Sequence, residues 1–247
     1  MTPPLHQIDR EGMHRLIPSR YSDAGTVLDD LADDDDMLEK LVRLDGATND
    51  RIQGEQFGLP SISTYELVYG IPNAQIVRAA FLHPSPAGAR FNSPTRGAWY
   101  AGDKLETSLA EVSYHKARHL ADIIVPESPA GVPEAESSTY DDWLADFHAE
   151  FHSLEPASAF TECLEPEPVP QCYAEPQRLA QKLLKEQSNG ILYPSVRKKG
   201  GHCLVCFRPA LVYRPRRDKR YILSFRWERN RYRQDVHEVL LRKADKR

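Results

Sequence analysis

The chain has 247 residues, 40% of them hydrophobic and 28% charged, which is typical of a folded globular protein. No apolar run approaches the roughly 20 residues that cross a bilayer, and the N-terminus lacks the basic and apolar blocks of a secretory signal. We therefore expect a cytoplasmic protein that does not enter the membrane. The four cysteines are too few for a disulfide scaffold, which agrees with a reducing compartment.

Opposite charges lie at the two ends of the chain, although the formal net charge is only −4. Six aspartates occur between Asp29 and Asp36, whereas residues 208–247 hold 14 Lys and Arg against 5 Asp and Glu. Blocks of like charge are usually solvated. The alternative is that the basic end faces an anion, such as a dinucleotide or an acidic partner.

The first half of the chain is predicted to alternate between helices and strands. Residues 1–35 lack sustained periodicity and are expected to form a loosely ordered arm, and the apolar spacing over 37–46 predicts a short helix. The apolar run 76–82, bounded by prolines, predicts a strand. A second strand is expected at 99–101 and a longer helix at 108–120.

In the second half, Trp143, Phe147 and Phe151 recur at helical spacing and predict an amphipathic helix whose aromatic side packs in the core. A further helix is expected over 176–187, because Asn189-Gly190 follows as a stop signal. Three predicted strands follow, at 191–193, 203–207 and 221–227.

Short strands and separated helices favour an α+β fold over a regular βαβ arrangement. We expect an N-terminal extension, residues 1–75, that is partly helical. The main domain is expected to span 76–247, with a helical insertion at about 121–187.

Three residues close in sequence suggest chemistry. The Arg90 guanidinium can hold a phosphate or a ribose hydroxyl, and the Tyr100 ring can stack on a flat cationic ring. Glu111 is expected in the first turn of its helix, where a carboxylate can steady positive charge on a sugar. Each has an ordinary structural explanation: a surface ion pair for Arg90, core packing for Tyr100, and a capping box with Ser108 for Glu111.

Five ordered blocks of sequence together resemble the RES domain, the toxin of RES–Xre toxin–antitoxin pairs. The blocks span residues 88–92 (GARFN), 99–101 (WYA), 109–112 (LAEV), 190–195 (GILYPS) and 200–207 (GGHCLVCF). The Arg, Glu and Ser that name the family correspond to Arg90, Glu111 and Ser195, and Tyr100 matches the family's active-site tyrosine. The order and spacing of five blocks are more specific than any single motif.

The resemblance implies a mixed sheet similar to that of ADP-ribosyltransferase toxins, and an enzyme that depletes NAD by releasing nicotinamide. Arg90 would anchor NAD, Tyr100 would stack on nicotinamide, and Glu111 would bind the ribose and stabilise an oxocarbenium-like transition state. Ser195 would position the substrate by hydrogen bonding. Asn92 is also expected at the NAD site. Arg78 is expected there as a second anion contact, with a structural ion pair as the alternative.

NAD is expected as the substrate, without a separate cofactor, and an Xre-like antitoxin as the protein partner. A homo-oligomer or a toxin–antitoxin complex is the expected assembly. The sequence does not distinguish NAD glycohydrolase activity from phosphorolysis or from ADP-ribose transfer to a macromolecule. A second alternative is a module that binds nucleic acid or protein and lacks catalysis.

Two metal patterns and one nucleic-acid pattern are given less weight. Cys203 and Cys206 invite a zinc site with Cys163 and Cys172, but an apolar strand runs between them, so buried thiols are expected. The i, i+4, i+8 spacing of Glu111, His115 and His119 is more typical of a partly exposed helix face, and no metal is expected. The aromatic and arginine residues of 213–232 are better explained by strand packing than by RNA binding.

Overall fold

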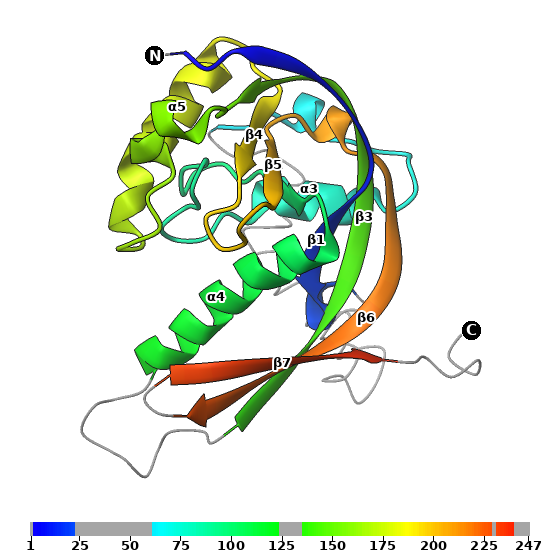
Figure 1. Cartoon of the computed structure of the whole chain (residues 1–247). Coiled ribbons are helices and arrows are strands. Elements are labelled where there is room, and N and C mark those ends of the chain that lie inside the picture. Colours follow the sequence, from blue (N-terminus) through cyan, green and yellow to red (C-terminus); the bar gives the residue numbers. More distant parts are fainter. Residues whose placement is uncertain (1, 23–60, 124–134, 229–230, 240–247) are drawn as a thin grey trace.

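The computed structural model describes residues 2–22, 61–123, 135–228 and 231–239 (Figure 1). These residues form one seven-stranded sheet with three α-helices, which confirms the α+β class. The strand order is β1-β2-β5-β4-β3-β6-β7, with a further pairing between β1 and β3. The strands are β1 (Leu5–Pro18), β2 (Trp99–Gly102), β3 (Ala135–Ser153), β4 (Gly190–Pro194), β5 (His202–Cys206), β6 (Tyr213–Glu228) and β7 (Arg231–Val239). The helices are α3 (Ala74–Leu82), α4 (Leu105–Ile123) and α5 (Ala174–Lys185).

Strand β1 occupies 5–18 of the loosely ordered arm predicted over 1–35, so that prediction was wrong there; residues 23–35 lie outside the described residues. β1 runs antiparallel to β3, from the pair Leu5–His152 to the pair Pro18–Tyr140, and His14 also bridges to β2. The sequence hides this strand because its pairing register shifts between Arg10 and Met13, which breaks the alternation of apolar residues. Through β1, the strands β1, β2, β5, β4 and β3 close into a ring.

The predicted aromatic helix around Phe147 is instead the long strand β3, at the centre of the sheet, so the expected insertion at 121–187 is not wholly helical. Trp143, Phe147 and Phe151 are spaced by four residues, and four is an even number. That spacing places side chains on one face of a strand as well as on one face of a helix. The three rings are buried as expected, with Phe147 packed edge to face on Phe151 at 6.1 Å.

The apolar run at 76–82 belongs to α3 and is not a strand. Asn73, in the left-handed conformation with φ 60°, precedes the helix. Ile76, Val77 and Phe81 turn into the core against the sheet. The run is too short for apolar content alone to distinguish a helix from a buried strand.

The other predicted elements of the main domain are confirmed. β2, β4 and β6 contain the predicted strands, and α4, which begins at Leu105, contains the predicted helix. β5 and α5 match the predictions at 203–207 and 176–187 but end one and two residues earlier. Figure 1 shows α5 outside β4 and β5, and α4 on the side of the molecule that carries β7. The predicted helix over 37–46 lies outside the described residues, and the boundary at 75/76 stays a prediction.

Buried aspartates of β3 pair with the basic segment that follows residue 208. Asp141 accepts hydrogen bonds from Arg220 at 2.6 and 2.9 Å, and Asp146 accepts one from Arg216 at 3.0 Å. Burial alone would raise the pKa of both carboxyls. Hydrogen bonds from Arg220 and the Ser22 hydroxyl to Asp141, and from the Gly12 amide and Arg216 to Asp146, instead hold each pKa below its usual value. Part of the C-terminal positive charge is therefore neutralised inside the molecule.

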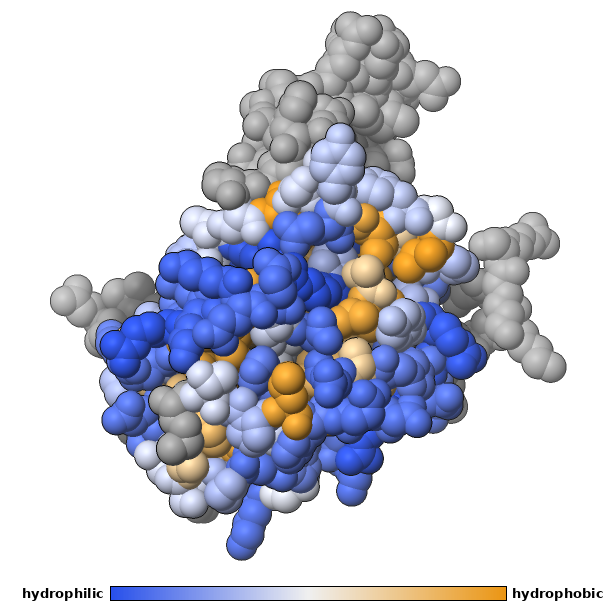
Figure 2. Space-filling view, turned by 90° about the horizontal axis from the view of Figure 1, so that it is seen from above, coloured by the Kyte–Doolittle hydropathy of each residue, from blue (hydrophilic) through white to orange (hydrophobic). Residues whose placement is uncertain are grey.

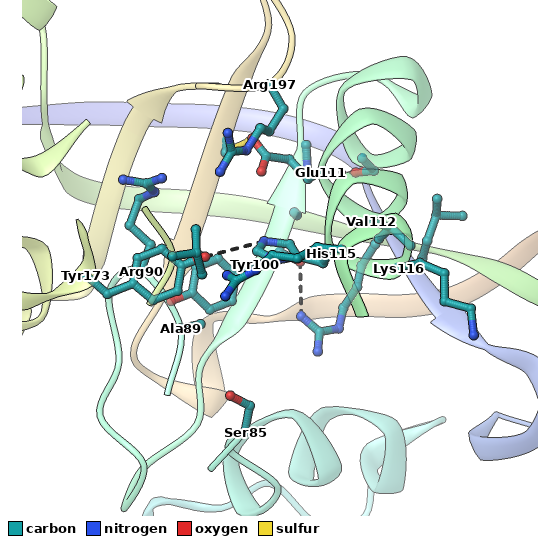
Figure 3. A pocket seen from close by; sticks show the side chains of 18 of the residues that line it. Ser85, Ala89, Arg90, Tyr100, Glu111, Val112, His115, Lys116, Tyr173 and Arg197 are labelled. Atoms are coloured by element: carbon teal, nitrogen blue, oxygen red, sulfur yellow. Dashed lines mark hydrogen bonds between the residues drawn. The ribbon is translucent and has the colours of Figure 1, made fainter. Parts of the chain in front are cut away.

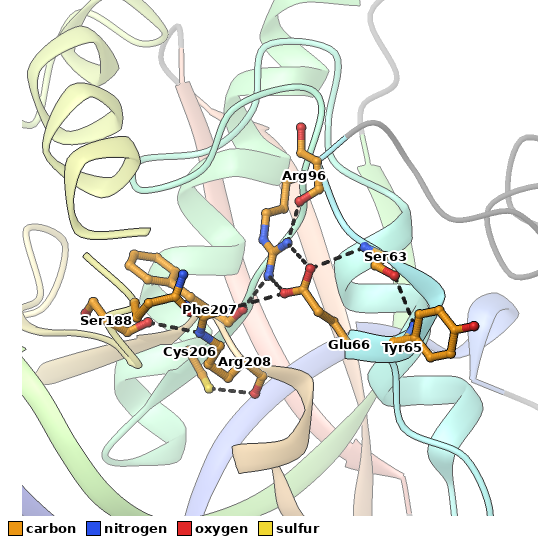
Figure 4. Close-up of polar contacts among 10 residues, drawn as sticks. Ser63, Tyr65, Glu66, Arg96, Ser188, Cys206, Phe207 and Arg208 are labelled. Atoms are coloured by element: carbon orange, nitrogen blue, oxygen red, sulfur yellow. Dashed lines mark hydrogen bonds and ion pairs between the residues drawn. The ribbon is translucent and has the colours of Figure 1, made fainter. Parts of the chain in front are cut away.

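A second polar cluster joins three separate segments (Figure 4). Glu66 pairs with Arg96 at 2.9 Å and with Arg208 at 3.4 Å. Arg96 also donates to the carbonyl of Phe207 at 2.9 Å, at the end of β5. The cluster fixes the loop that precedes β2 against the end of β5.

On the face shown in Figure 2, the coloured residues are mostly hydrophilic, and apolar residues occur in small separate groups. Within the described ranges, no helix has both the length and the apolar character needed to cross a membrane.

Candidate active site

A cavity of about 620 Å³ opens between β1, β2, α4 and the loops at 85–90 and 169–173 (Figure 3). Its volume lies in the range of roughly 300–1,000 Å³ that is usual for small-molecule sites. Arg90, Tyr100 and Glu111 all line this cavity, so the fold brings together residues that lie on a loop, a strand and a helix.

The loop at 88–92 sets the position of Arg90. Gly88 has φ +69°, and a Cβ there would lie 2.2 Å from the carbonyl oxygen of Asn92, so only glycine fits. Arg90 is 6% exposed. Its Nη1 donates to the carbonyls of Cys163 and Glu165 at 3.1 and 2.8 Å. The guanidinium also lies over the Tyr173 ring, 5.3 Å from its centre. Arg90 therefore faces the cavity and also holds the segment that borders it.

Tyr100 presents its ring to the cavity while its hydroxyl is engaged elsewhere. The hydroxyl donates to Asn92 Oδ1 and accepts from the backbone N–H of Phe91, both at 2.9 Å. Burial raises the pKa of Tyr100, so the phenol stays protonated. Asn92 is buried and does not line the cavity, and its contact with Tyr100 gives it a supporting position.

Glu111 and Ser195 are in direct contact. Ser195 Oγ donates to Glu111 Oε1 at 2.6 Å and accepts from the backbone N–H groups of Arg197 and Lys198 at 3.2 and 3.0 Å. Ser195 itself does not line the cavity and lies behind the carboxylate. The sequence predicts Glu111 in the first turn of its helix. Because α4 begins at Leu105, Glu111 lies in the second turn instead.

The capping box between Ser108 and Glu111, which was the ordinary structural explanation for Glu111, does not form. Ser108 Oγ instead donates to the carbonyl of His14 at 2.6 Å and accepts from the N–H of Gly102 at 3.1 Å. Glu111 is thus free of a capping role, and its carboxylate is held by Ser195.

Arg78 lies on α3 and does not line the cavity. Its Nη1 donates to the carbonyl of Val68 at 3.1 Å, and its guanidinium lies over the Tyr69 ring, 4.9 Å from the centre. Its position is that of a structural arginine, and its assignment as an anion contact receives no support from the geometry.

The cavity residues that were not assigned to an NAD site from the sequence include Arg15, His115, Tyr173 and Arg197. His115 is one helical turn after Glu111 and so lies on the same helix face. This i, i+4 spacing is visible in the sequence and could have identified His115 as a cavity residue. Its ring is accessible within the cavity, but burial, and next the neighbouring guanidinium groups, lower its pKa to about 4. His115 is therefore neutral at physiological pH. Figure 3 shows Arg197 beside Glu111, and Tyr173 beside Arg90.

The charges that line the cavity are strongly unequal. Among the described residues that line it, five side chains are cationic and one, Glu111, is a carboxylate; the cations are Arg15, Arg90, Lys116, Arg118 and Arg197. A concave surface with this balance attracts anions. None of the described residues beyond 207 lines the cavity, so the described part of the basic C-terminal segment does not supply this charge.

A family model described as RES domain matches residues 67–228. The chain belongs to the RES domain family. The matched segment contains Arg90, Tyr100, Glu111 and Ser195, whereas β1 lies before it. No curated protein matches the chain.

The cysteines of this RES domain lie mostly in the interior. Cys163, Cys203 and Cys206 are buried free thiols, as expected, and Cys172 is partly exposed. Burial, and next the charge of Glu111, raise the pKa of Cys203 well above its usual value, so this residue stays a neutral thiol. Within the described ranges no three His, Cys, Asp or Glu side chains are grouped as metal ligands would be.

Proposed function

We propose that this RES domain protein cleaves the bond between nicotinamide and ribose in NAD. The observation that carries the proposal is the position of Glu111. Of the described residues that line the cationic cavity, Glu111 alone is acidic, and Ser195 Oγ donates a hydrogen bond to its Oε1 at 2.6 Å.

The reaction needs little from the protein beyond positioning and electrostatics. When the C1′–N bond breaks, its electron pair stays on the nitrogen, so the cationic pyridinium leaves as neutral nicotinamide. Positive charge then develops on the ribose, as in glycoside cleavage. A carboxylate fixed beside that carbon stabilises the charge without reorganising. If water is the acceptor, its oxygen bonds to C1′ and its proton passes to solvent.

The rest of the cavity suits the rest of the dinucleotide. The arginines match the diphosphate, and the Tyr100 ring offers a surface for the nicotinamide. In this proposal Arg90 contacts the diphosphate, and Asn92 acts through Tyr100. Ser195 acts through Glu111.

The proposal includes a toxin role, with an Xre-like antitoxin as the partner that neutralises it. An antitoxin that covers the cavity would prevent NAD from entering. We propose water as the acceptor of ADP-ribose. If phosphate or a macromolecule were the acceptor instead, the reaction products would carry it.

The test is release of nicotinamide from NAD by the purified chain, with the products analysed by mass with and without phosphate and a cell lysate. Glu111→Gln keeps the shape of the side chain and removes its charge, so we expect the rate to fall by about 100-fold or more. Glu106→Gln is the matched control, because Glu106 is exposed on the same helix and does not line the cavity. Unchanged nicotinamide release by Glu111→Gln would refute the proposal.

A further inference from the structure

Arg197 is a cavity residue whose guanidinium is held by groups that do not line the cavity. Its side chain is only 10% exposed, and its Nη1 lies 3.7 Å from Glu167 Oε1. Its Nη2 donates to the carbonyl of Pro166 at 2.6 Å, and the guanidinium lies over the Tyr114 ring, 3.4 Å from the centre. The positive charge of this cavity residue is therefore already shared with a carboxylate of the protein.

Glu167 belongs to a proline-rich loop, residues 165–170 (EPEPVP), that borders the cavity. Val169 and Pro170 of this loop line the cavity, whereas Glu167 does not, and its side chain is 53% exposed. The Tyr114 hydroxyl donates to Glu167 Oε1, and the Val169 N–H donates to Oε2 at 3.3 Å. These bonds fix the carboxylate beside Arg197 and join it to the cavity wall.

An anion that enters the cavity meets both the attraction of Arg197 and the repulsion of Glu167. Arg197 is not fully satisfied by its present contacts, because its buried Nε has no hydrogen-bond partner among the described residues. Burial lowers the pKa of Arg197, and the charges of Glu111 and next Glu167 oppose that shift. Solvent screens the half-exposed Glu167, so the repulsion is expected to change the affinity for an anion only several-fold.

We propose that Glu167 is an autoinhibitory counterion, which pairs with Arg197 in the free protein and competes with the phosphate groups of a ligand for this guanidinium. The inference rests on the proposed function, because it takes the diphosphate of NAD as the competing anion. The proline-rich loop then lowers the affinity of the cavity for ligands that carry phosphate.

The competing explanation is that Glu167 orients Arg197 for the ligand. The two explanations predict opposite signs. A counterion that competes weakens the binding of phosphate, so its removal tightens binding. A carboxylate that orients the arginine strengthens binding, so its removal weakens it. Comparing ADP with adenosine isolates the effect, because these ligands differ only in the diphosphate.

The experiment is calorimetric titration of the full chain with ADP and with adenosine. Glu167→Gln keeps the shape of the side chain and removes its charge. We expect it to bind ADP about two- to fivefold more tightly than the wild type, which is the size of effect usual for a partly exposed ion pair. Adenosine carries no phosphate, so its affinity should not change.

Glu162→Gln is the matched control. Glu162 is exposed in the segment that leads into the proline-rich loop and does not line the cavity, so both affinities should stay unchanged. Glu167→Asp keeps the charge on a shorter side chain, farther from Arg197, and its ADP affinity should lie between those of the wild type and Glu167→Gln. If Glu167→Gln proves unfolded in a thermal melt, tighter ADP binding by Glu167→Asp is the result expected, and equal or weaker binding overturns the proposal.

Three results would overturn the autoinhibitory role: equal or weaker ADP binding by Glu167→Gln, an equal gain for ADP and adenosine, or no ADP binding by either protein. Nicotinamide release is measured separately, and there Glu167→Gln should lower KM for NAD and leave kcat within about twofold. Tighter ADP binding by Glu167→Gln in a protein that releases no nicotinamide would refute the proposed function alone. Nicotinamide release with an ADP affinity that ignores Glu167 would refute the autoinhibitory role alone.

Discussion

The hydrogen bond between Ser195 and Glu111 shows how one residue can act through another. Ser195 Oγ accepts hydrogen bonds from two backbone N–H groups and donates one to Glu111 Oε1. The hydroxyl is fixed by its own loop and in turn fixes the carboxylate. This arrangement fixes the carboxylate before a substrate arrives, which is how preorganised electrostatic sites lower an activation barrier.

Ser195→Ala is expected to lower kcat for nicotinamide release by about tenfold, less than Glu111→Gln, because the carboxylate remains but loses a charge-assisted hydrogen bond of about 1.5 kcal/mol. KM should change little, since Ser195 lies behind the carboxylate and does not line the cavity. Ser195→Thr keeps the hydroxyl and should restore most of the rate. A loss in Ser195→Thr as large as that in Ser195→Ala would contradict this positioning role.

The sequence could predict some residues of the candidate site but not those that reach the cavity only through the folding of distant segments. Arg90, Tyr100 and Glu111 stand in recognisable blocks, and the structure brings all three to one cavity. Arg15 could not be predicted, because it reaches the cavity only when β1 pairs with β2 and β3. Tyr173 is likewise placed by a loop whose path depends on Arg90.

At the scale of elements, the spacing of apolar residues decided which helices and strands could be predicted from the sequence. α4 and α5 were recognisable because their apolar residues recur at spacings that a strand cannot match. β3 was not, since its aromatic residues stand at even intervals that suit either structure. β1 was hidden by an irregularity in its register.

Phe147→Ala tests the packing of β3. Phe147 is fully buried against Phe151, so truncation should lower the free energy of unfolding by about 3–5 kcal/mol. Urea denaturation measures this. Glu150→Ala, an exposed position on the same strand, should change it by less than about 0.5 kcal/mol. A small loss for Phe147→Ala would contradict the burial of this ring.

A histidine couples the first strand to the third. His14 Nδ1 lies 2.7 Å from Asp142 Oδ2, and this hydrogen bond raises the pKa of His14 above its usual 6.5, although burial opposes the shift. A raised pKa in the folded state means that folding binds a proton. The stabilisation is therefore complete below pH 6.5 and is lost as the pH rises through the higher value in the folded protein.

We accordingly expect the free energy of unfolding of His14→Asn to approach that of the wild type as the pH rises above 6.5. Denaturation at a series of pH values measures the difference. His6→Asn, an exposed position on the same strand, should show a difference that does not vary in this way. A wild-type advantage that grows with rising pH would contradict the pairing of His14 with Asp142.

At the scale of the whole molecule, charge is arranged in two separate systems. Asp141 and Asp146 of β3 take up arginines of β6, while the cavity keeps cations of its own. The C-terminal positive charge was visible in the sequence, but its partners were not, because β3 and β6 meet only in the folded sheet. These arginines of β6 thus pair with buried aspartates of the fold, whereas the cationic residues of the cavity come from other elements.

The pairing of β1 with β3 also sets the order in which the molecule can be completed. Leu5 of β1 pairs with His152 of β3, and β2 pairs with β5 at Cys203 to Cys206. Contacts so distant along the chain close late and make folding slow. During synthesis the first strand emerges long before anything exists for it to pair with. The cavity is completed only after its last lining residue in the chain, Cys203, has been synthesised, so a shorter nascent chain holds an unfinished site.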